Sequence, residues 1–372
     1  MTKQSNKLKS NQIMKQYNIN QLRERLQLHF HWNYYRLLFL TRFVTSLVIS
    51  STVNLTKIAL LFNTDSKHQS NYRGLQRFFK YFNLNYIEYM HFVLKQLPSK
   101  EKFYLVIDRT NWKFGRSPIN ILMLGIIYKK QCFPFCWELL DKGGSSSSTE
   151  RKELLQRAIQ VLGKDRILGL LGDREFIGVR WFKYLIDEGI EFHIRIPKQI
   201  RVGSILLSNR RTVNWLFRHW KENAKTDYHK PVKILGYNLW LSGMKSAKGY
   251  CVVVSSKDNS NSLEKYQLRW TIENMFGSFK TRGFNFEQTH MKDPDKIKKL
   301  IALVSIAYVW CVMVGLWINE TIKIRIVTHG RKEKSIFRVG YDYLTTFIKK
   351  LLACEIYNPS EFKEVVRLLS CT

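Results

Sequence analysis

The chain has 372 residues, 45% of them hydrophobic, so it can bury a large core and is not a disordered chain. Its formal net charge of +32, from 61 Lys and Arg against 29 Asp and Glu, is too large for an ordinary cytosolic enzyme and indicates a polyanionic partner, first of all nucleic acid. The six cysteines include no C-x-x-C pair and have no histidines at zinc-finger spacing, which predicts reduced thiols in a cytoplasmic protein.

Residues 1–98 have the pattern of a helical DNA-binding domain. Within them, residues 53–82 read as a helix, a short turn and a second helix, Ser66 to Phe82, with one apolar side. A helix-turn-helix places such a second helix in the major groove of DNA. An ordinary helical hairpin would give the same pattern, but the net charge favours DNA recognition. The polar residues expected to contact DNA are Lys67, Gln69, Asn71, Arg73 and Arg77.

Residues 99–200 change to short β-rich runs. Three of them at close spacing predict antiparallel strands, and Ser147 with Glu150 forms a capping box before an amphipathic helix. A buried strand, a helix and another strand follow. This order of three strands, helix, strand, helix and strand is that of a ribonuclease-H-like α/β domain.

The remaining segments complete the predicted division of the chain. Residues 201–256 are basic and β-like, and residues 257–325 return to the α/β pattern as the second part of the core. Residues 300–318 carry no charge and are long enough to cross a bilayer, but the basic sequence on both sides favours a buried core helix and no membrane. Residues 326–372 form a C-terminal helical region that could serve dimerisation.

Two aspartates stand where apolar strands meet loops. Asp108 ends the run FYLVID, and Asp173 follows ILGLLG. A single aspartate there is often only a turn residue, but two of them in strands that could be neighbours indicate a site, because unpaired buried charges are costly. With Glu273 on a later helix they form a three-carboxylate set, which suits two Mg²⁺ ions, with Mn²⁺ as a substitute.

The stretch EKYQLRWTIENMFGSFK places four polar groups on an otherwise apolar helix. At about 100° per residue, Tyr266, Arg269, Glu273 and Lys280 fall in one narrow stripe beside the apolar face. A surface ion pair between Arg269 and Glu273 would account for part of this pattern. Beside the metal-binding carboxylate Glu273, however, the other three side chains are suited to holding the phosphates of a strand being cut.

These motifs resemble those of bacterial insertion-sequence transposases of the DDE type, in the branch with the signature Tyr-x2-Arg-x3-Glu-x6-Lys, the insertion-sequence-four family. The signature is complete, from Tyr266 to Lys280, and DRTNW at Asp108 and GDREF around Asp173 resemble the family's two aspartate motifs. The resemblance implies cut-and-paste transposition by a homodimer bound to terminal inverted repeats and then to target DNA.

The resemblance also implies that residues 201–256 are a β-strand insertion and that cleavage can pass through a DNA hairpin with a flipped base. Tyr250 stands where relatives have a base-stacking Trp, and Trp270 matches a second family aromatic. The implied location is the bacterial cytoplasm, at the nucleoid. Three alternatives stay open: a ribonuclease-H-like nuclease or resolvase, a DNA-binding regulator without catalysis, and a degenerate transposase copy.

Overall fold

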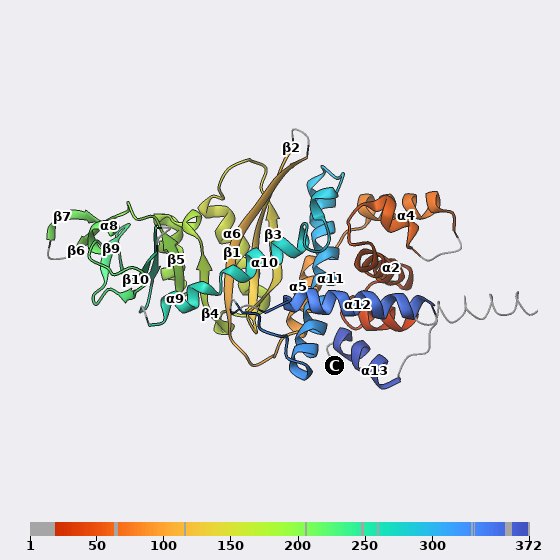
Figure 1. Cartoon of the computed structure of the whole chain (residues 1–372). Helices are drawn as coiled ribbons and strands as arrows, with labels where there is room; N and C mark the ends of the chain where they lie inside the picture. Colours follow the sequence, from red (N-terminus) through yellow and green to blue (C-terminus); the bar gives the residue numbers. More distant parts are fainter. Residues whose placement is uncertain are drawn as a thin grey trace, which may run out of the picture. The chain divides into compact units, whose positions relative to one another are not determined.

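The computed structural model describes residues 19–62, 66–114, 117–204, 207–246, 249–258, 260–328, 330, 332–353 and 359–370. The chain divides into two compact units, drawn together in Figure 1. Residues 99–275 form one, called here the sheet unit. Residues 1–98 and 276–372 together form the other, called the helical unit.

The sheet unit contains all the strands of the main sheet. Its helices are α6 (Ser148–Leu162), η1 (Lys164–Arg166), η2 (Arg174–Phe176), α7 (Val179–Asp187), α8 (Val213–Leu216), α9 (Ser262–Gln267) and the start of α10 (Trp270–Phe279). Its strands are β1 (Phe103–Phe114), β2 (Ser117–Tyr128), β3 (Gln131–Leu139), β4 (Ile167–Gly172), β5 (Phe192–Ile196), β6 (Arg201–Ser204), β7 (Leu207–Thr212), β8 (Lys225–Asp227), β9 (Val232–Ile234), β10 (Tyr237–Ser246) and β11 (Gly249–Ser255).

The sheet is mixed, so the fold is α/β. Its strands follow the order β3-β2-β1-β4-β5-β11-β10-β9-β6-β7, with β8 beside β10. The first three strands are antiparallel, whereas β1, β4 and β5 run parallel. The predicted order of three strands, helix, strand, helix and strand over residues 99–200 is observed. Buried parallel strands at the centre explain why FYLVID and ILGLLG are almost continuously apolar.

The loop after β3 leads into α6 through the predicted capping box. The Ser147 hydroxyl accepts the backbone N–H of Glu150, and the Glu150 carboxylate accepts the backbone N–H of Ser147. These bonds satisfy two of the free N–H groups at the start of the helix. The sequence signal at this point therefore fixes where α6 begins.

Residues 201–256 continue the same sheet. Strand β11 pairs antiparallel with β5 on one side and with β10 on the other. The shorter strands β6 to β9 extend beyond β10, and helix α8 lies between β7 and β8 in the chain. The β-like texture of this stretch is therefore observed, and its last strand is an integral part of the main sheet.

The helical unit consists, where it is described, of helices and the turns between them. It includes helical residues 19–27, α2 (Tyr34–Ser50), α3 (Leu55–Leu60), α4 (His68–Tyr81), α5 (Tyr86–Lys95), η3 (Phe286–Gln288), α11 (Pro294–Thr321), α12 (Ile336–Ala353) and α13 (Pro359–Ser370).

Helix α11 is the core of this unit. It packs against α2, α4, α5, α12 and α13. The approach of α12 is so close that a Cβ atom on Gly340 would overlap the carbonyl oxygen of Cys311. Among the described helices α11 alone is long and apolar enough to cross a membrane, but 83% of its most apolar window is buried inside the protein. Such burial is that of a core helix, and length and composition alone are weak evidence for a span.

Candidate active site

Asp108 and Asp173 are brought together by parallel pairing of β1 with β4. In that ladder Ile107 of β1 is opposite Gly172 of β4. Asp108 follows Ile107 in the chain, and Asp173 follows Gly172. The Asp108 carboxylate accepts the backbone N–H of Arg109 at 2.7 Å. Asp173 caps η2 by accepting the N–H of Arg174, also at 2.7 Å. Asp173 therefore directly follows the end of β4, as expected. Asp108 does not end its strand, because β1 runs on to Phe114 through its pairing with β2, and that expectation is corrected. The pairing of β1 with β4 nevertheless places the two aspartates on neighbouring central strands.

The Arg269 guanidinium joins Asp108 to Glu273. Its Nη1 lies 3.2 Å from Asp108 Oδ2, and its Nη2 lies 2.5 Å from Glu273 Oε1. The Arg269 side chain is only 3% exposed, whereas that of Glu273 is 40% exposed. One buried cation thus links two of the three predicted catalytic carboxylates.

Tyr266 completes the link to the third carboxylate. Its hydroxyl donates to Asp173 Oδ1 at 3.4 Å and accepts from Arg269 Nε at 3.1 Å. The tyrosine ring is buried against Val253 and Leu263. Arg195 of β5, which the sequence did not single out, places its Nη1 3.9 Å from Asp173. The structure therefore gathers Asp108, Asp173, Glu273, Tyr266 and Arg269 into one contact network.

Burial controls the electrostatics of this network. It raises the pKa of Asp108 to about 6, although the Arg109 N–H and the Arg269 charge act to lower it. Burial alone would lower the pKa of Arg269, but Tyr266, Glu273 and Asp108 raise it overall, so the guanidinium stays charged. Burial therefore disfavours the ionised form of Asp108, and the permanent charge of Arg269 partly offsets this effect.

The structure corrects the expectation of a single helix from residue 264 to 280. Helix α9 ends at Gln267 and α10 starts at Trp270. Between the two helices the backbone forms hydrogen bonds from residue i to residue i−3, such as that from the Arg269 N–H to the Tyr266 carbonyl. The tightened turn occurs where the Arg269 side chain is buried among carboxylates. Lys280 follows α10 within the helical unit and forms an ion pair with Glu287 at 2.8 Å. Its place in the predicted stripe is not part of the network described above.

The donor atoms fit a divalent metal ion in chemistry, although not in spacing. Carboxylate oxygens are the ligands that Mg²⁺ and Mn²⁺ prefer. The Arg269 guanidinium lies between Asp108 and Glu273, so the mostly buried Asp108 already holds a cation. Over the part of the chain that the structure describes, no three Asp, Glu, His or Cys side chains are close enough to hold a metal ion.

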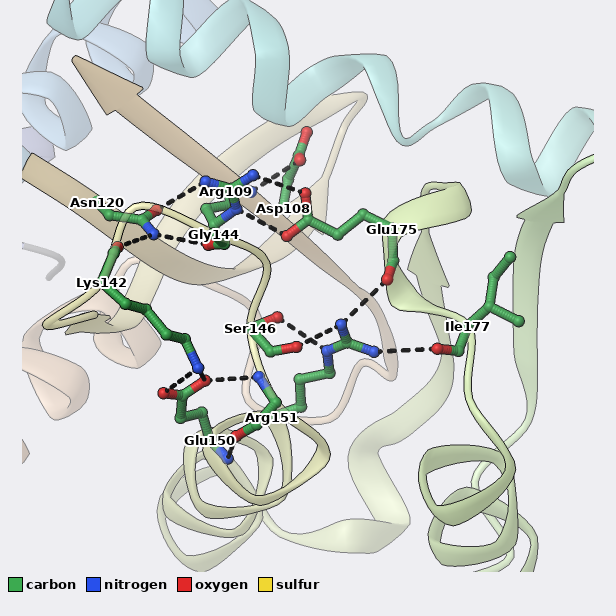
Figure 2. Close-up of polar contacts among 11 residues, drawn as sticks. Asp108, Arg109, Asn120, Lys142, Gly144, Ser146, Glu150, Arg151, Glu175 and Ile177 are labelled. Atoms are coloured by element: carbon green, nitrogen blue, oxygen red, sulfur yellow. Dashed lines mark hydrogen bonds and ion pairs between the residues drawn. The ribbon is translucent and has the colours of Figure 1, made fainter. Parts of the chain in front are cut away.

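A further ion pair ties the Asp108 segment of β1 to η2, which follows Asp173 (Figure 2). Arg109 follows Asp108, and Glu175 lies two residues after Asp173. Arg109 Nε and Nη2 donate to the two oxygens of Glu175 at 2.7 and 3.1 Å. This bidentate geometry fixes both distance and orientation. Neither residue was predicted from the sequence to have a role, but they stand beside the aspartates in DRTNW and GDREF.

The loop between β3 and α6 supports this ion pair, as Figure 2 shows. Arg109 Nη1 donates to Asn120 Oδ1 at 2.9 Å, and Asn120 donates in turn to the carbonyls of Lys142 and Gly144. The buried Arg151 donates to the Glu175 carbonyl at 3.0 Å and to Ser146. The polar loop is therefore structural, because it completes the hydrogen bonding of the Asp108 and Asp173 segments.

A buried histidine anchors α9, which carries Tyr266. His193 of β5 bonds through one ring nitrogen to Glu191 at 2.9 Å and through the other to Ser255 at 2.8 Å. Ser255 bonds to Ser262 at the start of α9. Burial lowers the pKa of His193 to about 4, aided by the charge of Lys265. The neutral imidazole is thus a structural link, since it is fully buried and has no access to a substrate.

The residues predicted to recognise DNA lie on α4 of the helical unit. The helix runs from His68 to Tyr81, slightly shorter than predicted, and Lys67 is its N-cap without a side-chain cap bond. Arg73, Arg77, Gln69 and Lys67 are exposed. Asn71 differs, because its amide donates to the Ala59 carbonyl of α3 at 3.5 Å. Asn71 therefore fastens α4 to α3.

The two aromatics predicted to stack on a base lie at different places in the sheet unit. Trp270 is 57% exposed and lies at the edge of the carboxylate network. The centroid of its ring is 5.2 Å from the Arg269 guanidinium carbon. Tyr250 lies in β11 opposite Lys245 of β10 and is half-buried. Arg269 and Tyr266 make the contacts that join the carboxylates. Of the two predicted stacking residues, Trp270 is the one that lies next to Arg269.

Comparison with known proteins bears on this site. A protein-family model described as "Transposase DDE domain" matches residues 104–310, which include both aspartates, Glu273 and the whole Tyr-Arg-Glu-Lys signature. None of the curated protein sequences matches this chain.

Among solved structures, the chain is similar to one described as a cryo-EM structure of the piggyBac transposase synaptic complex with hairpin DNA. The sequence identity is 14%, and the match covers 89% of this chain and 84% of that chain. The TM-score is 0.39, so the likeness is distant.

Proposed function

This chain belongs to the transposase DDE domain family, a family of DNA transposases, and we propose that it cuts its own element out of DNA and joins it to a target. The observation that supports this proposal is the convergence of Asp108, Asp173 and Glu273 on one buried guanidinium and its tyrosine partner. The reaction consists of phosphodiester hydrolysis at the element's terminal inverted repeats and transesterification into target DNA.

Asp108, Asp173 and Glu273 are the residues proposed to hold two Mg²⁺ ions, or Mn²⁺ in their place. When bound, such ions activate an attacking water or 3′-hydroxyl and stabilise the leaving oxygen, so no side chain is required as a base. The protein's own contribution is to position the carboxylates. Parallel pairing of β1 with β4 and the ion pair between Arg109 and Glu175 hold the Asp108 and Asp173 segments together before DNA arrives.

Arg269 has two roles in this proposal. Without DNA it compensates the charge of Asp108 and Glu273, as observed. With DNA bound, its planar guanidinium grips a phosphate of the cleaved strand, Tyr266 adds a hydroxyl hydrogen bond, and Lys280 supplies a further charge. Trp270 and Tyr250 are the proposed stacking partners of a flipped base in a hairpin intermediate.

The finer assignment follows from the motifs and the strand order. We place the chain in the insertion-sequence-four branch, with a ribonuclease-H-like core of residues 99–200 and 257–325 and a β-strand insertion at 201–256. The strand order β3-β2-β1-β4-β5 supports this core. The helical residues 1–98 would bind the terminal repeats, the C-terminal helices of 326–372 would serve dimerisation on DNA, and the protein would work in the bacterial cytoplasm at the nucleoid.

The test is cleavage of a terminal-repeat duplex identified in the DNA flanking the gene. The full-length protein with Mg²⁺ should nick this duplex at the repeat end and join the end to a second DNA. Binding without cleavage would favour a non-catalytic regulator. Cleavage of a scrambled duplex or of branched DNA at the same rate would favour a ribonuclease-H-like nuclease or resolvase.

A further inference from the structure

A groove runs beside the exposed face of α4 in the helical unit. One part is a cavity of about 660 Å³, and a second depression of about 490 Å³ adjoins it through the shared residues Gln76 and Lys80. The two depressions together are called the α4 groove. Its first part is lined by residues 53–56, by Tyr72, Gln76 and Lys80 among the residues of α4, and by residues 289–293 and 296.

The groove draws its walls from two distant parts of the chain. One wall is α4 and the segment before α3, and the other is the segment from Thr289 to Lys296, which leads into α11. The walls are tied together by polar contacts. Lys299 of α11 donates to the Phe79 carbonyl at 2.9 Å, and Thr52 donates to Gln288 at 2.8 Å. The groove is therefore a preformed feature of the helical unit.

The charged side chains among the described lining residues of the groove are mostly basic. The cavity has Lys80, Lys292 and Lys296 against one acid, Asp293, whose carboxylate accepts the backbone N–H of Lys296 as the cap of α11. The second depression adds Arg73 and Arg77. Lys80 and Lys292 are exposed, and Lys296 is half-buried. An open, preformed depression with several cations attracts a polyanion rather than a neutral ligand.

We propose that the α4 groove binds the sugar–phosphate backbone of the duplex that α4 contacts, with Lys292 and Lys296 on its phosphates. This inference rests on the proposed function, because it takes DNA as the partner. It adds a second contact element, residues 289–296, to the recognition helix. Phosphate contacts of this kind fix the register of a recognition helix on DNA but carry no sequence information.

The experiment compares two double variants of the full-length protein with equal charge. Lys292→Gln with Lys296→Gln removes groove lysines, whereas Lys349→Gln with Lys350→Gln removes exposed lysines of α12 that do not line the groove. Affinity for the repeat duplex is measured by fluorescence anisotropy over a range of salt concentrations. The slope of log K against log salt is negative, and each lost phosphate contact makes it shallower by about 0.9.

The groove variant should therefore lose about 1.8 from the slope and bind about tenfold more weakly, while the α12 variant keeps the wild-type slope. Equal slopes for the two variants would overturn the proposal. Melting temperatures show whether each variant is folded. If the double variant unfolds, the single variant Lys292→Gln, at an exposed position, replaces it in the comparison. It should lose about 0.9 from the slope.

Two further arms test small-anion binding and repeat recognition separately. If inorganic phosphate raises the melting temperature of the wild type but not of the groove variant, and the DNA slopes are equal, the groove is a small-anion site and the proposal is wrong. If the wild type does not prefer the repeat duplex to a scrambled one, yet the groove variant still loses slope, the groove inference stands and repeat recognition by the proposed transposase fails.

Discussion

The carboxylate site and the α4 groove use charge in opposite ways. In the site, Arg269 faces Asp108 and Glu273, and Arg109 faces Glu175, so cations and anions compensate each other in a largely buried network. In the groove, basic side chains outnumber acidic ones among the described lining residues, and most are exposed. A compensated site positions reacting groups, whereas a surface with an excess of basic side chains provides affinity for a polyanion. Substitutions in the two regions should therefore change different measured quantities.

Arg269→Ala should have the largest effect of the single changes in the positioning network. It leaves Asp108 buried without its cation, which should lower the free energy of unfolding by about 3 kcal/mol. Cleavage should fall on the order of 10²-fold, because misplacement by about 1 Å costs that much. Repeat affinity should change little, since many other basic residues contribute to it.

A gel assay that scores nicks, hairpins and strand transfer separately measures this effect, with Arg269→Lys as the charge-preserving comparison. Hairpins should disappear before first-strand nicks, because they demand the tightest DNA distortion. Lys280→Ala, which removes a cation outside the contact network, tests the proposed phosphate clamp in the same assay. Normal nicks, hairpins and joining in both alanine variants would reduce the polar stripe to a solvated helix face.

Glu175→Gln should have the next largest effect, on the order of tenfold in cleavage rate. It weakens the bidentate pair with Arg109 that links β1 to the segment after Asp173. The matched control is Glu138→Gln, which weakens the more exposed pair between Arg157 and Glu138 in the same unit. The control should cleave normally. Equal cleavage rates for both variants at equal melting temperature would show that the ion pair between Arg109 and Glu175 has no role in positioning the aspartates.

Arg73→Ala should have the opposite effect to Arg269→Ala, with weaker repeat binding and unchanged cleavage. Binding of the repeat should weaken by about 1–3 kcal/mol if Arg73 contacts a base, with specificity relaxed at one position. The rate of cleavage at saturating protein should not change. A uniform loss over all sequences would make Arg73 a phosphate contact. Unchanged binding would contradict the assignment of α4 as the recognition helix.

The last prediction concerns stability at acid pH, through His193, and expects no effect on cleavage at neutral pH. Its pKa is lowered to about 4 by burial and by Lys265, against the opposing effects of Glu191 and Asp258. Between pH 6.5 and 4 the unfolded chain therefore binds more protons than the folded one, so this contribution to stability is lost as the pH falls. Urea unfolding of the wild type should show this loss, and His193→Gln should lack it. Parallel pH profiles would exclude His193 as the cause.

The sequence predicted the elements well where a local pattern determines them. The apolar runs indicated the order of strands and helices, and Ser147 with Glu150 marked the start of α6, because capping depends on residues three apart. The broken helix at residues 268–269 was not predictable in this way. There the burial of the Arg269 guanidinium among carboxylates from β1 and α10, a tertiary effect, accompanies the departure from helical periodicity.

The candidate site shows the same division. Asp108, Asp173 and Glu273 could be proposed from strand ends and motif spacing. The partners of Arg109 could not, because its contact with Glu175 depends on β1 lying beside β4, 66 residues away in the chain. The groove was missed for a similar reason. Lys292 precedes α11 and Lys296 lies in its first turn, and only the packing of α11 against α4 brings them to α4.

The central claim is that Asp108, Asp173 and Glu273 perform the chemistry and do not merely balance charge. The most direct measurement compares purified Asp173→Asn with Asp187→Asn, an exposed aspartate that pairs with Lys183. With Mg²⁺ and the terminal-repeat duplex, Asp173→Asn should bind normally and lose nicking by about 10³-fold or more, since several kcal/mol of barrier lowering depend on the carboxylates. Asp187→Asn should nick like the wild type. Nicking by Asp173→Asn at a near wild-type rate would contradict the assignment of the active site.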